Sequence, residues 1–177
     1  MRRNLTDVDA LKALAHPLRQ QMFTHLNRYG PATCADLAAA FGADRGGTSY
    51  HLRQLARYEF IEEDHSAGRR RYWRAKPLDL RLPYASEDPE ISAASDAISR
   101  GWIEQAQRDL FAFLADKQSH GEFGEAAMNS FGNLTLNADE LREFGEAYIV
   151  FLNGWHREPT PGSRAVTVLF NAFPTPS

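Results

Sequence analysis

Apolar residues recur at steps of three and four through the first third of the chain, a spacing that predicts short amphipathic helices. The segment TDVDALKALA (6–15) fits a first helix capped by Thr6 or Asp7. It should end before His16–Pro17, because proline disfavours a helical residue ahead of it and can begin the next helix. PLRQQMFTHLNRYG (17–30) then predicts a second helix that stops at a glycine.

The next two predicted helices are separated by a tight turn. TCADLAAAFG (33–42) has Thr33 as its N-cap, with Asp36 three residues further on, and it stops at Gly42. After the turn GADRG, the pattern predicts a helix from about 47 to 58. Four short helices in succession are therefore expected to open the chain.

The fourth predicted helix has two different faces. At about 100° per residue, Thr48, Leu55 and Ala56 lie within about 60° of Leu52, so this face should pack. His51 lies between the faces and is expected to pack rather than to bind a ligand. Guanidinium, amide and phenol groups, which hydrogen-bond base edges and phosphates, occupy the other face. The residues that carry them are Tyr50, Arg53, Gln54 and Arg57.

A basic hairpin is predicted directly after this helix. FIEED (60–64) and RRRYWRA (69–75) read as two short strands joined by HSAG. Alternation places Trp73 with Arg71 on one face of the hairpin, where Trp73 should anchor it on the helices. A helix with polar tips beside a basic hairpin predicts a two-point grip on duplex DNA, with the helix in the major groove.

These first 76 residues resemble the winged helix-turn-helix domain of bacterial ArsR-type regulators. The likeness rests on LKALAHPLRQQMFTHL, on GPATCADLAAAFGADRGGTSYHLRQLARYEFIEE and on GRRRYWRA, with TSYHLRQL in the place of the family's recognition helix. It implies a transcriptional regulator, expected to be a repressor, that binds double-stranded DNA as a homodimer. The DNA contacts that it implies are Ser49, Tyr50, Arg53 and Gln54 at bases, Arg45 and Arg57 nearer phosphates, and Arg69, Arg70 and Arg71 on the wing.

The chain departs from the family's metal-sensing members. Those proteins carry a paired Cys-x-Cys before the recognition helix, whereas Cys34 is the only cysteine of this chain. We therefore predict no metal site and no cofactor. No glycine-rich phosphate loop, nucleophile elbow or His-Glu-x-x-His motif occurs either, so we expect that the protein is not an enzyme.

Beyond a proline-containing linker at about 76–88, the longest helical pattern of the chain runs from 89 to 117. Such a helix is roughly 40 Å long, too long for a small domain to cover. Pairing of its apolar stripe with a second copy is the favoured interpretation, and packing within one chain is the alternative. AAMNSFGNLTL (126–136) and RAVTVLFNAF (164–173) then predict two strands. A helix capped by Asn137, with Glu140 in the capping box, is predicted between them.

The expected fold class is mainly α (α+β). Residues 1–80 should form the winged helix-turn-helix DNA-binding domain, and residues 81–177 a long dimerisation helix with a small α+β unit. Aromatic residues enrich the second half and could line a pocket for a small apolar effector, although aromatic stripes more often form plain core. The candidate effector-binding residues are Trp102, Phe131, Tyr148 and Trp155.

Charge divides the chain in the same way. Residues 1–80 hold 13 Lys and Arg against 9 Asp and Glu, a net charge of +4, whereas residues 81–177 hold 7 against 14, a net charge of −7. A polyanion is drawn to the first part and repelled by the second. No signal peptide or membrane span is recognised, so we expect a cytoplasmic protein without a membrane partner.

Sequence-specific regulation of transcription is the function that these patterns favour. The alternative is a winged-helix interaction module that docks its arginines on an acidic protein partner. A third hypothesis, an enzyme in the C-terminal half, has only helical carboxylate pairs such as Glu143 and Glu146 to support it, and such pairs are usually solvated.

Overall fold

The computed structural model describes residues 2–65, 70–77, 79–83, 86–155, 157–158 and 160–175. The chain divides into two compact units, residues 1–108 and 109–177, which are described separately below. The division falls inside the long helix rather than near residue 80, because the first part of that helix packs on the N-terminal unit.

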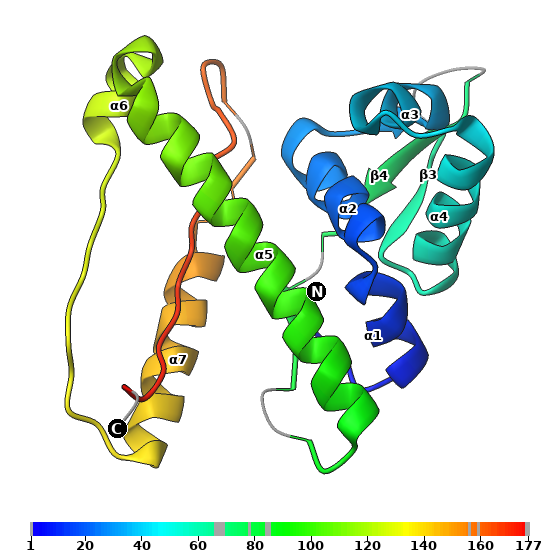
Figure 1. The fold of residues 1–177 in the computed structure, drawn as a ribbon. Helices are drawn as coiled ribbons and strands as arrows, with labels where there is room; N and C mark the ends of the chain where they lie inside the picture. Colours follow the sequence, from blue (N-terminus) through cyan, green and yellow to red (C-terminus); the bar gives the residue numbers. More distant parts are fainter. Residues whose placement is uncertain are drawn as a thin grey trace. The chain divides into compact units, whose positions relative to one another are not determined.

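The first two helices form where the periodicity predicts them (Figure 1). Helix α1 covers Val8–Ala15, and the side chain of Asp7 caps it by accepting hydrogen bonds from the backbone of Asp9 and Ala10. Helix α2 covers Pro17–Tyr29 and begins directly after His16, whose extended ψ of 125° breaks the helix. Proline as the first residue of α2 loses no helical hydrogen bond, since its missing N–H would have no partner there.

The next two helices form the helix-turn-helix. Helix α3 covers Cys34–Phe41, and Thr33 and Asp36 make the predicted capping box. Gly42 ends it in the left-handed conformation, at φ 60°, which glycine adopts without strain. Helix α4 covers Arg45–Arg57 and begins two residues earlier than predicted, because Asp44 caps it by accepting a hydrogen bond from Gly47 at 2.8 Å.

A three-stranded antiparallel sheet forms the wing. Strand β4 (Tyr72–Ala75) lies between β3 (Ile61–Asp64) and β2 (Ala32–Thr33). The predicted hairpin is thus confirmed, and Trp73 is buried as expected. Strand β2 was not predicted, and neither was a second small sheet in which β1 (Arg2–Asn4) pairs in parallel with β5 (Asp79–Arg81).

One continuous apolar cluster holds the first unit together. Helix α2 packs against both β4 and α4, so the sheet and the helix-turn-helix share a single core. Burial of this apolar surface is the main stabilising contribution in a domain of this size. The largest fully buried side chains of the cluster are Leu5, Leu11, Leu14, Met22, Leu37, Leu52, Leu55, Phe60, Ile61 and Ile98.

Helix α5 (Pro89–Ala115) confirms the predicted long helix, but the first part of its stripe is occupied. Ala94 and Ile98 are buried in the core of the first unit, and Ile91 and Trp102 pack against it. This part of the stripe thus packs within one chain, as in the alternative interpretation, and pairing of the helix with a second copy stays a prediction. Further along α5, in the second unit, most side chains are exposed, whereas Phe113 is partly buried against His120.

The second unit is built differently from the expected α+β arrangement. After α5 come the 3-10 helix η1 (Lys117–His120), α6 (Glu122–Ala126) and α7 (Ala138–Asn153), and Asn137 with Glu140 forms the predicted capping box of α7. The strands predicted at 126–136 and 164–173 do not form among the described residues. The chain is therefore mainly helical with small sheets, and within the described residues all of the sheet lies in the first unit.

Candidate nucleic-acid interface

Helix α4 presents one packed and one solvent face, as its periodicity predicts. Thr48, Leu52 and Leu55 are buried against the core, and the Thr48 hydroxyl donates to the Asp44 carbonyl at 2.8 Å. This hydrogen bond satisfies a polar atom that would otherwise be buried without a partner. The packed face fixes the rotation of α4, so the residues on its other side point to solvent.

The predicted base-contacting residues share this solvent face. Tyr50 and Arg53 are exposed, and Ser49 and Gln54 are partly exposed. With Arg57 they follow each other at steps of three and four, so they form one stripe along α4. The guanidinium of Arg53 has no ion-pair partner in the part of the chain that the structure describes. It is therefore available to an external acceptor.

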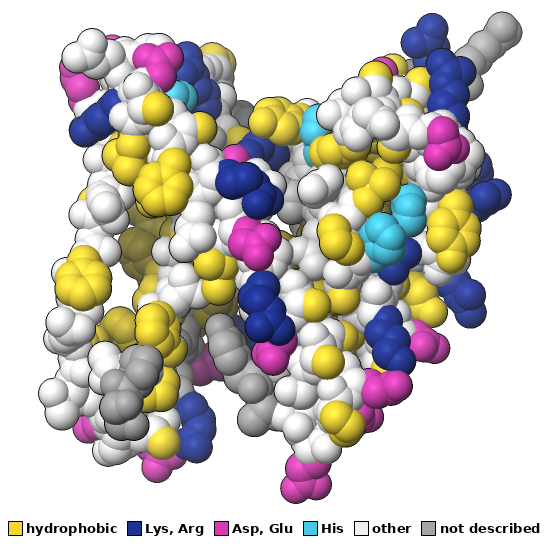
Figure 2. Space-filling view, in the orientation of Figure 1, with side chains coloured by type: hydrophobic (Ala, Val, Ile, Leu, Met, Phe, Trp, Pro, Cys, Tyr) yellow, Lys and Arg dark blue, Asp and Glu magenta, His cyan; other side chains and the backbone are white. Residues whose placement is uncertain are grey.

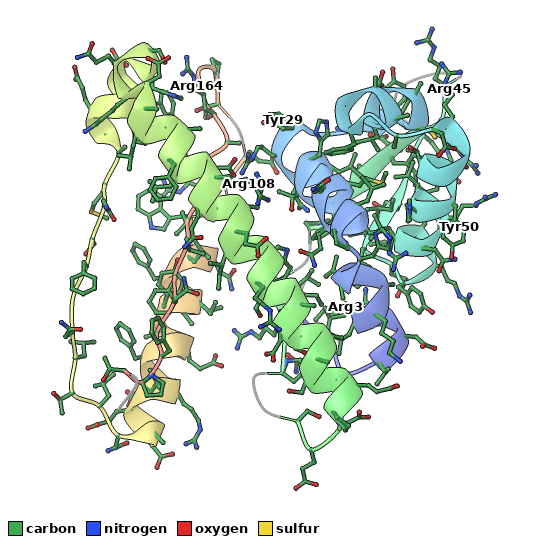
Figure 3. All side chains as sticks on the ribbon, in the orientation of Figure 1. Arg3, Tyr29, Arg45, Tyr50, Arg108 and Arg164 are labelled. Carbon is green, nitrogen blue, oxygen red and sulfur yellow. The ribbon has the colours of Figure 1, made fainter. Side chains whose placement is uncertain are left out.

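Basic side chains extend the stripe at both ends. Arg45 opens α4 and Arg57 closes it, and both are exposed. Figure 3 shows Arg45 and Tyr50 projecting from α4 away from the rest of the unit, and Figure 2 shows Lys and Arg side chains along this edge. The guanidinium of Arg57 lies 5.5 Å from the ring centre of Tyr58, a cation–π contact that holds it at the C-terminal end of the helix.

The three wing arginines differ in their surroundings. Arg70 and Arg71 are both exposed, but the Arg71 guanidinium pairs with Glu63 at 2.5 Å and lies 5.4 Å from the centre of the Trp73 ring. The hydrogen bond from Arg71 lowers the pKa of the Glu63 carboxyl, which keeps the pair charged at neutral pH. Arg69 lies outside the described residues. Arg70 is thus the described wing arginine most accessible to a phosphate.

Two histidines are in contact between helix α4 and the start of α2. The rings of His16 and His51 lie 4.5 Å apart between centres, and both Nδ1 atoms are buried without a hydrogen-bond partner among the described residues. The Tyr50 ring contacts His51 edge-on at 5.5 Å. His51 therefore packs, as expected, but its partner His16 could not be predicted because the two residues are far apart in sequence.

Both of these imidazoles favour the neutral form. Burial lowers the pKa of His16 and, to a smaller extent, the charge of Arg19 lowers it further. Burial also lowers the pKa of His51, with smaller contributions from His16 and Arg19, and Asp44 opposes them. His25 on α2 has its pKa lowered by burial and by Arg28. Protonation of any of these three histidines would place a positive charge in a partly buried site near an arginine, which is unfavourable.

We expect the protein to lose stability as the pH falls below about 6.5. Histidine in an unfolded chain has a pKa near 6.5, so below that pH the unfolded state binds more protons than the folded state. The thermal unfolding midpoint of the full chain should therefore drop by a few degrees between pH 7 and pH 5.5. A His16→Asn, His51→Gln variant should show a smaller drop. Equal midpoints for the wild type at both pH values would contradict the expectation.

The four residues proposed for an effector do not line a common cavity within the described part of either unit. Phe131 is 93% exposed, Trp155 is also exposed, and Tyr148 stacks on Phe170 at 3.8 Å. Trp102 alone borders a groove, of about 450 Å³, between α2 and α5. Most of the residues that line this groove are polar: Gln20, Gln21, Thr24, Arg100, Glu104, Gln105 and Arg108.

Comparison with known proteins supports the helix-turn-helix assignment of the N-terminal unit. A family model described as a helix-turn-helix domain matches residues 14–64, from the end of α1 to the end of β3. The chain matches none of the curated proteins with which it was compared. The described residues contain no cluster of three or more His, Cys, Asp or Glu placed to hold a metal ion, and none of their helices is long and apolar enough to cross a membrane.

Proposed function

We propose that the protein is a sequence-specific transcriptional regulator of the ArsR type, which binds double-stranded DNA as a homodimer and represses by occupying its operator. The solvent face of α4 carries this proposal. It displays a guanidinium, an amide and a phenol side by side while the opposite face is buried. The match to a helix-turn-helix domain model supports DNA binding independently of the side chains.

The roles proposed for the interface follow from side-chain chemistry. Arg53 and Gln54 suit bidentate hydrogen bonds to guanine and adenine edges, and Tyr50 and Ser49 add single hydrogen bonds. Charged side chains at the margins of the stripe suit phosphates, which position the protein without reading sequence. The residues proposed for phosphates are Arg45, Arg57, Arg69, Arg70 and Arg71.

Arg71 is less suited than Arg70 to contact a DNA phosphate, because its guanidinium already pairs with Glu63. Releasing it to a phosphate would leave Glu63 without its partner, close to the negative DNA backbone. We therefore assign the main wing contact to Arg70. Helix α4 in the major groove and the wing on the flanking backbone then form one two-point grip.

In this proposal, residues 1–80 bind DNA and residues 81–177 serve dimerisation and effector binding. The groove beside Trp102 is where a small effector would bind. Because seven of the twelve lining residues carry polar side chains, the groove suits a ligand with hydrogen-bonding groups better than a purely apolar one.

Binding to DNA fragments from the native genome tests the proposed function. Selected fragments should share two half-sites about 10 base pairs apart, or a multiple of that distance, and affinity should fall steeply as salt rises. Arg70→Ala should weaken binding to all sequences by a similar factor and reduce the salt slope by about one. Arg142→Ala, at an exposed arginine of α7, should leave both unchanged.

Two outcomes would overturn the proposal. One is the absence of any enriched duplex in the selection. The other is that the protein captures an acidic protein from nuclease-treated lysate and binds no DNA detectably. This capture would have to depend on Arg53 and Arg70. That second result would assign the arginine surface to a protein partner instead.

A further inference from the structure

The groove between α2 and α5 lies entirely within the first unit. It forms because α5 contributes Ala97 and Gly101 to its lining, four residues apart and so on one face of the helix. Neither residue has a side chain large enough to fill the space between two packed helices. The volume of about 450 Å³ falls within the usual range of small-molecule sites, so the groove has room for a ligand.

Gln20 of α2 supplies a buried polar group to this groove. It is only 6% exposed, and its Nε2 donates to the carbonyl oxygens of Ala15 at 3.3 Å and Ala97 at 3.5 Å. These two bonds fix the orientation of the amide, because exchanging its ends would turn Oε1 toward two carbonyl oxygens. Oε1 therefore points toward Gly101, which also lines the groove. No N–H or O–H group of the described residues donates to it.

This unpaired oxygen indicates that the groove takes a hydrogen-bond donor. A buried acceptor without a partner is costly, and the Cα–H of Gly101 is only a weak donor. A β-carbon at position 101 would overlap Oε1, so the glycine is what allows the amide to lie there. Glycine inside a helix is destabilising, and the space that it leaves for Gln20 explains its presence in α5. An O–H or N–H group of a ligand would complete the hydrogen bonding of Oε1.

Arg100 gives the groove a positive charge that the protein does not balance. Its side chain is exposed, and it makes no ion pair among the described residues, although Asp96 lies one turn before it. The other charged residues of the lining are Glu104 and Arg108, whose charged groups lie 3.9 Å apart and offset each other. Two arginines against one glutamate leave the lining with a net positive charge, which attracts an anion.

The chemistry of these residues narrows the class of ligand. A guanidinium binds a carboxylate through two parallel hydrogen bonds. One unbalanced arginine, close in sequence to Glu104, suits the single charge of a carboxylate better than the double charge of a phosphate. The partly exposed ring of Trp102 adds an apolar wall for the body of the ligand.

We propose that the groove between α2 and α5 binds a small organic carboxylate that also carries a hydroxyl or N–H donor. Arg100 holds the carboxylate, Oε1 of Gln20 accepts the hydrogen bond from the donor, and Trp102 contacts the body of the ligand. The proposal rests on the effector groove of the proposed function, and it states the class of ligand and the residue that recognises each of its groups.

Matched probes test the two polar contacts on the full-length chain. Para-hydroxybenzoate has both groups, benzoate lacks the donor, para-hydroxybenzamide lacks the charge, and tyramine carries an ammonium instead of the carboxylate. Calorimetric titration, with ligand-observed NMR for weak binders, gives the dissociation constants. Para-hydroxybenzoate should bind about 3- to 10-fold more tightly than benzoate and at least about 10-fold more tightly than para-hydroxybenzamide. The pair β-hydroxybutyrate and butyrate repeats the donor comparison with a smaller, aliphatic body.

Two variants assign each preference to its residue. Arg100→Gln should abolish the preference for para-hydroxybenzoate over its amide and keep the preference over benzoate. Gln20→Met, which keeps the length of the side chain without its amide, should do the reverse. These ratios compare ligands on the same variant, so a general loss of stability does not change them. Arg100 is exposed, so its variant should fold even where Gln20→Met does not. Arg142→Gln, on α7, is the matched control and should keep both preferences.

Three results would overturn the proposal. The first is that neither hydroxy-carboxylate binds at millimolar concentration. The second is tighter binding of tyramine than of para-hydroxybenzoate, which would give the deciding charge to Glu104. The third is that Arg100→Gln leaves the preference for the carboxylate unchanged, which would place the ligand outside the groove.

Failure of this inference and failure of the proposed function give different results. A chain that selects operator DNA but binds neither hydroxy-carboxylate refutes only the inference. A chain that binds them through Arg100 and Gln20 but selects no duplex supports the inference and refutes the proposed function.

Discussion

Leu52→Ala is expected to lower the free energy of unfolding by about 2–5 kcal/mol, enough to unfold much of a marginally stable domain. Leu52 is completely buried and attaches the middle of α4 to the common core of the first unit. Truncation loses the transfer free energy of the side chain and leaves a cavity that the surrounding helices can fill only in part.

Denaturant unfolding of the full chain, followed by circular dichroism, measures this effect. Arg53→Ala is the matched control, because the two residues are adjacent and lie on opposite faces of the same helix. The control should change stability by no more than about 0.5 kcal/mol, as is usual for surface substitutions. A loss below about 1 kcal/mol for Leu52→Ala would mean that α4 is not anchored as described.

Arg53→Ala, which should leave stability almost unchanged, is expected to alter recognition of DNA. Arg53→Ala should reduce discrimination between the preferred and a substituted base pair by about 1–3 kcal/mol, or roughly 5- to 150-fold. The physical reason is the loss of a two-pronged donor on the exposed face of α4. Competition gel shifts with operator variants mutated at one base pair each measure the effect.

Arg53→Lys sharpens that experiment. Lysine keeps the charge but cannot donate two parallel hydrogen bonds, so it should restore affinity more than base preference. Equal loss of affinity for every sequence with Arg53→Ala, fully rescued by lysine, would show that Arg53 contacts a phosphate. The proposed division of the α4 stripe into base and phosphate contacts would then have to change.

The sequence predicted the helices of the first unit well because their signals are local. The capping box of Thr33 and Asp36 and the break at His16–Pro17 each involve residues within four positions of each other. The packed face of α4 was also predictable, since Leu52 and Leu55 follow the helical period.

Features that depend on distant residues were missed. Strand β2 has only two residues, and it pairs with Tyr72 and Trp73 some forty positions away. The contact between His16 and His51 joins two helices whose packing no local pattern specifies. The ion pair between Arg71 and Glu63 likewise depends on the register of the hairpin, and it changes which wing arginine is accessible.

In the second unit, the strands predicted from the sequence do not form among the described residues. Alternating apolar residues at 126–136 and 164–173 are typical of strands, but a strand forms only when another strand lies beside it. Within the described residues no such partner is present, and the segments run without sheet pairing. The pattern predicted burial of alternate side chains, whereas Phe131 and Val166 are exposed in the structure.

Thr33 has two structural roles, which together connect the wing to the helix-turn-helix. Its backbone belongs to the strand paired with Tyr72, and its side chain caps α3. The base of the wing is therefore fastened to the start of the helix-turn-helix before any ligand arrives. The helix-turn-helix and the wing are therefore preorganised relative to each other, which lowers the conformational entropy that any binding event would cost at this junction.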